Sequence, residues 1–299
     1  MGYIYNPFFY SIFLFLAYKF MGDDWLKFKV GDLVSRISHN HDIVFRIISI
    51  DQQNVFLKGV DLRLYADADI DDLTIVNNVL NDDDSIIKRN LSLIHMDRDN
   101  YFYIPGKILH IDGDNDYLNR CMKFYKNMGI KANGITLPEK SVSSKIVNLI
   151  KEYRPDIVVV TGHDAYFSKK HDENDLNNYE NSSNFISAIK EARKYEKSQD
   201  KLIIIAGACQ SNYEKLIQAG ANFASSPKRI NIHALDPAII ASSVALSDKN
   251  QSIDLINMIK KTKYGSDGIG GIITNGTMYV GYPRWILILR KILFIKILV

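Results

Sequence analysis

Two side chains with the chemistry of a cysteine hydrolase, Cys209 and His163, each follow a run of apolar residues. His163 comes shortly after residues 157–160, and Cys209 comes shortly after residues 202–205. The stretch between them is long enough for one loop, one crossover helix and one strand. An imidazole that takes up the thiol proton, or holds the thiolate as an ion pair, makes a weakly ionised cysteine nucleophilic. The pair therefore predicts nucleophilic catalysis, with Cys209 as nucleophile and His163 as its base.

The neighbours of this pair would supply the other parts of such a site. Backbone N–H groups of Cys209 and of the Gly162–Asp164 turn would form an oxyanion hole. A helix that begins directly after Cys209 would add its positive end and favour the thiolate. A structural role is the alternative, because a cysteine is often only a small buried apolar side chain. Cys121, on the apolar face of a predicted helix, fits that alternative better than Cys209, which lies among small and polar residues.

Alternating strands and helices from Lys107 onward are the elements that must position the pair. Strands that are apolar at every residue are typical of a parallel sheet covered by helices on both faces. Ligands bind such sheets at the carboxyl ends of the strands, which is where Asp112, His163 and Cys209 lie. The predicted strands are 108–111, 130–137, 157–160 and 202–205, and the predicted helices run through 117–128, 146–153, 185–192 (capped by Ser182 or Ser183) and 213–217.

The residues before Lys107 follow a different pattern. Short runs over 28–36, 43–50 and 54–60 alternate apolar and polar positions, and 51–53 suits a hairpin turn. These runs predict a small SH3-like β-barrel domain over residues 24–77. A polar linker with one short helix follows over 78–104, and the α/β domain takes up 105–284. Late in that domain, Asn275-Gly276 predicts a type I′ hairpin within 272–280.

Both ends differ from the body of the chain. Residues 1–20 hold an apolar run that is too short for an ordinary membrane span and lacks the marks of a signal peptide. We interpret residues 1–20 as the result of an upstream choice of the start codon, with the true beginning of the protein at Met21. Residues 285–299 mix aliphatic side chains with three cations, which indicates either contact with a membrane surface or a fortuitous extension.

Composition excludes several classes of function. The net charge is +3, and the cations of the two ends leave the body of the chain near neutral, without the electrostatic footprint of a nucleic-acid-binding protein. Two cysteines far apart in sequence form no disulfide framework and favour a reducing, cytoplasmic compartment. The seven histidines show no close metal-ligand spacing, so we expect no metal site and no cofactor.

Five segments of the sequence resemble the YabG family of sporulation-specific peptidases. The likeness extends from about residue 24 to Pro283, and the segments are 107–114, 160–166, 175–179, 206–211 and 220–237. The resemblance implies a cysteine endopeptidase whose partners are protein substrates, namely coat and cortex-associated proteins of the spore. It also implies action in the mother cell of a sporulating bacterium or at the forming coat. A strand-end His before a strand-end Cys is also similar to the caspase–gingipain–separase clan, which implies a caspase-like fold.

The clan resemblance implies roles for further residues. There the residue after the histidine, usually Gly, donates to the oxyanion; here it is Asp164, whose backbone N–H would act with that of Cys209. The end of the first strand contributes to the pocket for the residue before the cut, so Asp112 or Asp114 would select Arg or Lys. The alternative for both aspartates is a polar turn with a helix N-cap. His233 and Asp236 either help to close the site or orient His163, or belong to a structural loop.

Two other functions stay open at this point. One is a non-catalytic assembly protein of the spore coat, which would use both domains as binding surfaces. The other is a flavodoxin-like or amidotransferase-like enzyme that acts on small molecules, because a fold alone does not fix a function. The presence of both His163 and Cys209 at strand ends favours the peptidase.

Overall fold

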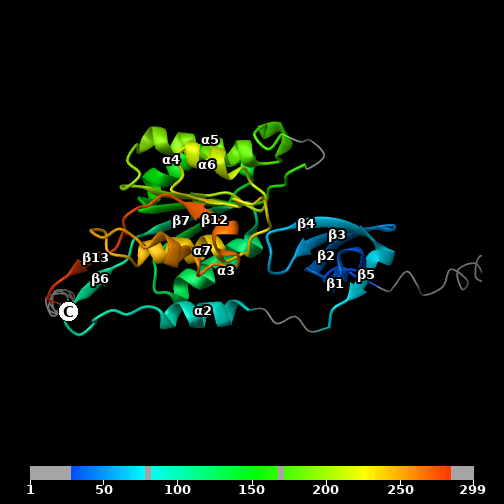
Figure 1. Cartoon of the computed structure of the whole chain (residues 1–299), viewed down its shortest axis with the longest axis horizontal. Helices are drawn as coiled ribbons and strands as arrows, with labels where there is room; N and C mark the ends of the chain where they lie inside the picture. The colour runs from blue at the N-terminus through cyan, green and yellow to red at the C-terminus, as the bar shows by residue number, and fades with distance from the viewer. Residues whose placement is uncertain (1–27, 78–81, 168–171, 284–299) are drawn as a thin grey trace, which may run out of the picture. The chain divides into compact units, whose positions relative to one another are not determined.

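The computed structural model describes residues 28–77, 82–167 and 172–283. The chain divides into two compact units (Figure 1). Within the described residues, the first unit runs to Val60 and resumes over 65–77, while the second holds Asp61–Leu64 and the remainder. Asp61–Leu64 therefore belongs to the second unit, although strands of the first unit precede and follow it. The interpretations of residues 1–20 and 285–299 concern parts of the chain outside the described residues.

The first unit is an antiparallel sheet in the order β4-β3-β2-β1-β5. Alternation along the strands buries one face, including Phe45 and Leu57. The predicted hairpin turn is confirmed, because Asp51 pairs with Asn54 across it. The SH3-like barrel is not confirmed, since β4 and β5 are the outer strands of an open order. The elements are β1 (Leu33–Arg36), η2 (Ile37–His39), β2 (Val44–Asp51), β3 (Asn54–Gly59), β4 (Tyr65–Asp69), η3 (Ile70–Asp72) and β5 (Leu73–Ile75).

The second unit is built on a six-stranded sheet in the order β12-β11-β10-β9-β7-β8. Neighbouring strands are parallel except for the pair β11 and β12. Every residue of β7, β9 and β10 is buried, as expected for apolar strands covered on both faces. The predicted parallel sheet is thereby confirmed. Its strands are β7 (Ile108–Asp112), β8 (Ala132–Thr136), β9 (Ile157–Thr161), β10 (Ile203–Ala206), β11 (Phe223–Ser225) and β12 (Ile269–Gly271).

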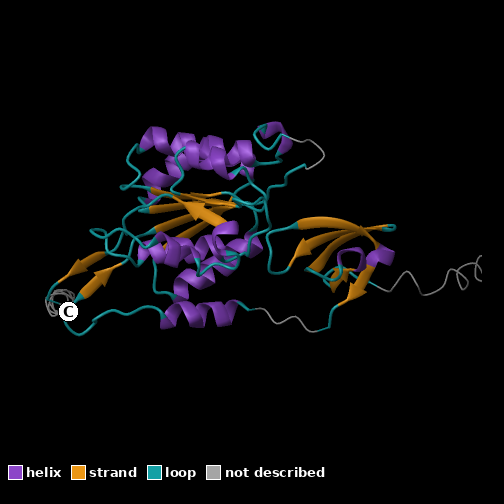
Figure 2. Cartoon of the chain, viewed as in Figure 1, coloured by secondary structure: helices purple, strands orange, loops and turns teal. Residues whose placement is uncertain are grey.

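Helices cover both faces of this sheet (Figures 1 and 2). On one face, α4 (Glu139–Tyr153) and α5 (Ser182–Tyr195) bury side chains such as Ile146 and Phe185 against alternate strand residues. On the other face, α3 (Asn115–Asn127) and α7 (Asp236–Ala245) pack against the remaining strand residues. The remaining helices of the second unit are α2 (Asp83–Ser92), η4 (Leu176–Asn178), α6 (Tyr213–Gln218), α8 (Leu255–Ile259) and η5 (Gly265–Asp267).

Two segments of the second unit differ from the sequence-based expectation. Helix α2 is the short helix expected within residues 78–104, but its Ile86 and Ile87 join the hydrophobic core together with residues of α3 and α7. The predicted hairpin at Asn275-Gly276 is wrong, because β13 (Tyr279–Gly281) pairs with the distant β6 (Phe102–Ile104). Among the described residues, no helix has both the length and the apolar character that a membrane span requires.

Candidate active site

The carboxyl edge of the sheet between β7 and β9 is the point from which successive connections diverge. Strand β7 lies between β8 and β9, while α3 and α5 cover opposite faces. Ligands of open α/β sheets bind outside the strand ends at a point of this kind. Strand β10 continues the same edge, because Val160 of β9 pairs with Ala206 of β10. The loops that carry Asp114, His163 and Cys209 therefore leave neighbouring strands in the same direction.

His163 is held by contacts to its backbone and to its ring. Its backbone N–H donates to Glu139 Oε1 at 2.8 Å, and its carbonyl oxygen accepts from Asn181 Nδ2 at 3.0 Å. Ring atom Nε2 lies 3.2 Å from Asp114 Oδ2. The Tyr117 ring packs beside the imidazole, with a centroid separation of 5.8 Å. The side chain as a whole remains 18% exposed, whereas its Nδ1 atom is buried.

Cys209 is fully buried, and its sulfur faces the backbone of Ile232. The Ile232 N–H donates to Sγ at 3.2 Å. Burial raises the pKa of the Cys209 thiol to about 12. The expected helix directly after Cys209 is wrong, because α6 begins at Tyr213 after an Asn212 cap. The thiol is therefore in its protonated form at neutral pH, and the start of α6 does not follow it directly as expected.

The Asp164 carboxylate connects the loop of His163 to the loop of Cys209. Its Oδ2 accepts hydrogen bonds from the hydroxyls of Ser182 and Ser211, and Oδ1 accepts from the Asn181 N–H. Ser211 Oγ in turn accepts from the Ala208 N–H at 2.9 Å. Burial raises the pKa of Asp164 above its usual range. Sequence reasoning considered only the backbone of Asp164 and missed this structural link made by its side chain.

Asp112 forms a buried ion pair with Arg63. Its carboxylate has no exposed surface, and Oδ2 accepts from Arg63 Nη1 at 2.6 Å and from the Thr161 hydroxyl at 2.8 Å. Burial alone would raise the pKa of this carboxyl, but the Arg63 guanidinium, the His110 ring and the Asp114 N–H together outweigh burial and hold the pKa well below its usual range. The prediction that Asp112 receives a substrate cation needs correction, because Arg63 of the chain itself fills that place.

Asp114 forms the helix N-cap that was the alternative interpretation. Its Oδ1 accepts from the N–H groups of Asp116 and Tyr117, at 2.9 and 3.2 Å, at the start of α3. Its Oδ2 faces His163. Both carboxylate oxygens are thereby engaged within the chain, which disfavours a role in binding a substrate side chain.

Glu139 is a further carboxylate at this edge, and sequence reasoning missed it. It is the first residue of α4 and is half-buried. A Cβ atom at either Gly113 or Gly162 would overlap its carboxylate, so a side chain at either position would force the Glu139 carboxylate to move. In the sequence, a Glu after Pro138 looks like an ordinary first-turn acid. Only the crossing of two loops, which is a long-range feature, places Glu139 beside His163.

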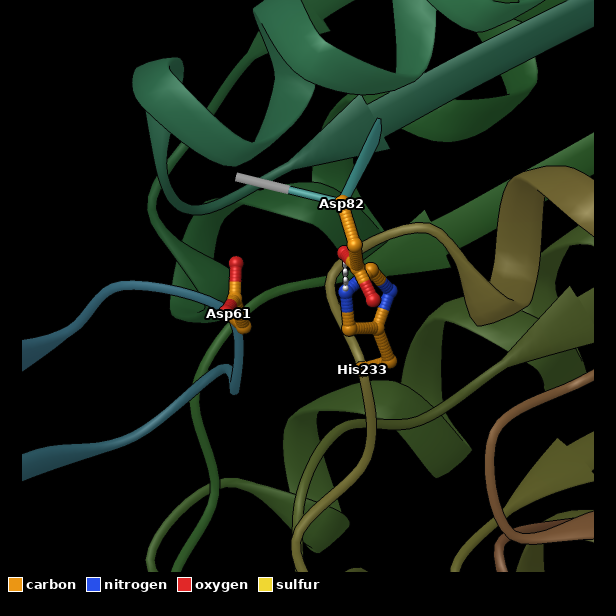
Figure 3. Close-up of side chains that lie close together, drawn as sticks. All are labelled: Asp61, Asp82 and His233. Carbon is orange, nitrogen blue, oxygen red and sulfur yellow. Dashed lines mark ion pairs between the residues drawn. The ribbon is translucent and has the colours of Figure 1, made fainter. Parts of the chain in front are cut away.

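His233 and Asp236 belong to a loop of their own rather than to the surroundings of His163. The His233 N–H donates to Asp236 Oδ2 at 3.1 Å, and Asp236 Oδ1 accepts from the Lys263 N–H. Figure 3 shows the His233 ring directed at Asp82, with Nε2 at 3.3 Å from Oδ1. These contacts favour the alternative that His233 and Asp236 belong to a structural loop.

Asp61, Asp82 and His233 are close enough to suggest a metal site, since one ligand atom from each lies within 4.8 Å of the others (Figure 3). However, His233 Nδ1 accepts a hydrogen bond from the Leu235 N–H, so a neutral ring carries its proton on Nε2. That nitrogen then has no lone pair for a metal. Asp61 Oδ1 also lies 3.3 Å from the Arg120 guanidinium. The donor set therefore suits an ion-pair network better than a cation.

Comparisons with known proteins point to one family. The family model described as YabG peptidase U57 matches residues 29–91 and 81–283. The sporulation-specific protease YabG of Bacillus subtilis (strain 168) is 40% identical over an alignment that covers 86% of this chain and 99% of that protein. Among solved structures, a cobalamin-binding protein from Desulfitobacterium hafniense DCB-2 matches 46% of this chain and 57% of its own, at 22% identity and a TM-score of 0.31. At that TM-score the similarity supports no conclusion about this chain.

Proposed function

Because the chain belongs to the YabG peptidase family, we propose that it is a sporulation-specific cysteine endopeptidase with Cys209 as nucleophile and His163 as general base. The observation that carries the proposal is the pairing of Val160 with Ala206, which brings the loops of both residues to one edge of the sheet. The proposed substrates are spore coat and cortex-associated proteins. Membership of a peptidase family favours this activity over a non-catalytic role in coat assembly.

The proposed reaction proceeds through a thioester. The thiol proton of Cys209 passes to His163, and Sγ attacks the carbonyl carbon of the scissile bond. Backbone N–H groups of Cys209 and Asp164 would meet the charge that develops on the carbonyl oxygen. Protonated His163 then gives its proton to the leaving amine. Water hydrolyses the thioester, and its proton returns through His163 to the sulfur.

The free protein holds Cys209 in a closed arrangement. The sulfur is covered, accepts the Ile232 N–H, and has a thiol pKa of about 12. A thiol in this state reacts slowly with any electrophile from solution. We infer that a bound substrate displaces the Ile232 segment, so that the thiol can reach the carbonyl carbon and His163.

A peptidyl chloromethyl ketone with Arg next to the ketone tests the nucleophile. We expect it to alkylate Cys209 and not Cys121, because the peptide delivers the electrophile to the edge of the sheet where the loops of His163 and Cys209 lie. Iodoacetamide should label both thiols slowly, since each is buried and has a pKa of about 12. Peptide mapping by mass spectrometry identifies the modified residue. Modification of Cys121 instead, or cleavage activity that survives full alkylation of Cys209, contradicts the proposal.

A preference for Arg or Lys before the cut is also part of the proposal, and Glu139 is the carboxylate that would bind that side chain. Asp112 and Asp114 are engaged within the chain, whereas Glu139 is half-buried beside His163. A half-buried carboxylate suits a guanidinium, which it can bind in a bidentate manner.

The Glu139→Gln variant tests this specificity. We expect kcat/KM for a peptide with Arg before the cut to fall roughly 10- to 100-fold, as for the loss of a hydrogen bond to a charged group. A matched peptide with Gln before the cut should be cleaved as by the unmodified protein, because the glutamine amide oxygen still accepts the His163 N–H. Equal losses on both peptides would mean that Glu139 only positions His163. No loss on either would remove it from the site.

A further inference from the structure

The Asp114 carboxylate has a fixed orientation. Its Oδ1 is anchored by two N–H groups at the start of α3, those of Asp116 and Tyr117. With Oδ1 so placed, Oδ2 is directed at His163 Nε2, at 3.2 Å. The Asp114 side chain is only 4% exposed, so water competes little for this contact. The helix that follows β7 therefore aims a carboxylate at the proposed catalytic base.

The His163 ring is constrained from its other sides as well. Its backbone is bound by Glu139 and Asn181, and the Tyr117 ring packs beside the imidazole. Since Tyr117 also donates a backbone N–H to Asp114, one helical turn supplies both the carboxylate and the packing surface. Rotation of the ring would break the contact to Asp114 and the packing against Tyr117 together.

We propose that Asp114 is a positioning residue that completes a Cys209–His163–Asp114 triad. The proposal rests on the function proposed above. An ionised carboxylate only accepts hydrogen bonds, so Nε2 of a neutral ring must carry the proton. Nδ1 then keeps the lone pair that takes up the thiol proton. When the ring becomes an imidazolium, the same carboxylate stabilises its charge, as the aspartate of other triads does. Asp114 itself exchanges no proton.

This role differs from the pocket function that the sequence suggested for Asp114. A pocket carboxylate must be open to a substrate cation, whereas both oxygens of Asp114 have partners within the chain. Loss of a pocket carboxylate would affect Arg substrates selectively. Loss of a positioning carboxylate should affect every substrate equally, because it acts on the base.

The Asp114→Asn variant separates these roles. Asparagine caps helices as well as aspartate does, but its amide N–H₂ would face Nε2 and favour the tautomer with the proton on Nδ1. We expect kcat to fall roughly 10²- to 10⁴-fold, comparable to the loss of a triad aspartate elsewhere, with KM nearly unchanged on Arg and neutral peptides alike. In ¹⁵N-histidine spectra of the free protein, the His163 signals should change from the Nε2–H pattern to the Nδ1–H pattern.

Asp116→Asn is the matched control, because Asp116 lies in the first turn of the same helix; it should keep both kcat and the His163 tautomer. If Asp114→Asn does not fold, Asp114→Ser keeps a capping hydroxyl without the carboxylate and should show the same fall in kcat. A fall in kcat with the tautomer unchanged would mean that Asp114 only caps α3, and unchanged kcat would also overturn the proposal. If Cys209→Ala remained active, the proposed function would fail, whereas the tautomer change would still report the Asp114–His163 contact.

Discussion

Cys209→Ala and His163→Ala should each lower kcat/KM on a coat-protein substrate by at least ~10³-fold, the scale seen when a triad member is removed from other proteases. The sulfur forms the covalent bond and the imidazole moves the proton, so neither contribution survives alone. The double variant should therefore be no worse than either single variant. Cleavage is followed by gel electrophoresis of the substrate, and folding by far-UV circular dichroism.

Cys121→Ala is the matched control for the nucleophile. Cys121 is equally buried, but its sulfur lies in the core, near the Arg63 guanidinium and the Ala234 carbonyl oxygen. We expect this variant to keep its activity within a few-fold, with a modest loss of stability. A folded Cys209→Ala protein that still cleaves the substrate would rule out the cysteine mechanism.

The core strands of the second unit could be predicted because their signal is local. Residues such as Val158 and Ile204 lie in unbroken apolar runs, which are typical of a strand covered on both faces. Strands β11 and β12 carry no such signal. Each has three residues, and β12 contains two glycines, so their strand geometry comes from pairing with neighbours. Long-range pairing of this kind is invisible to a single stretch of sequence.

The first residue of a helix is also hard to predict from a single stretch of sequence. A helix through Tyr213 was predicted, but its start was placed directly after Cys209. Asn212 is the true cap, because its Oδ1 accepts from the Lys215 N–H at 3.1 Å. Asparagine is a favoured cap residue, so the sequence contained the signal. The consequence is chemical, because the intervening residues separate the helix end from the Cys209 thiol.

The edge of the sheet that carries the candidate site could be predicted, but the partners of its charged side chains could not. Strand ends indicated that Asp112, His163 and Cys209 lie along one edge of the sheet. What each carboxylate does depends on residues from elsewhere in the chain. Arg63, from a segment between two strands of the first unit, neutralises Asp112, and Glu139 reaches His163 from the start of α4. No local pattern marks either contact.

Arg63 itself is unusual, because a guanidinium with no exposed surface needs every donor satisfied. Its Nη1 donates to Asp112 Oδ2 at 2.6 Å, and its Nη2 donates to the Ala234 carbonyl oxygen at 3.1 Å. Its Cζ atom lies 5.1 Å from the centroid of the Tyr117 ring, over which the guanidinium packs. Through these contacts, Asp61–Leu64 is joined to β7, to α3 and to the segment that follows Ile232. Asp112 Oδ1 also accepts from the Asp114 N–H at 2.9 Å, so the ion pair lies directly beneath the residue that faces His163.

Arg63→Met should lower the free energy of unfolding by about 3–5 kcal/mol, because it leaves the buried Asp112 carboxylate without its counter-charge. Denaturant unfolding followed by the helical far-UV signal measures this, since every described α-helix lies in the second unit.

The effect of Arg63→Met should also depend on pH. In the unmodified protein the pKa of Asp112 is depressed, so the contribution of the Arg63–Asp112 pair to stability is full above the unfolded pKa of about 4. This contribution is lost only as pH falls further. In the variant, burial without Arg63 raises that pKa above its unfolded value, so protonation relieves the penalty as pH falls from neutral. The stability difference between the two proteins should therefore shrink on acidification toward pH ~4, and Arg63→Met with Asp112→Asn should recover most of the loss at neutral pH. A difference that is independent of pH, or a double variant no more stable than Arg63→Met alone, would show that Arg63 stabilises the fold through its packing and not through its charge.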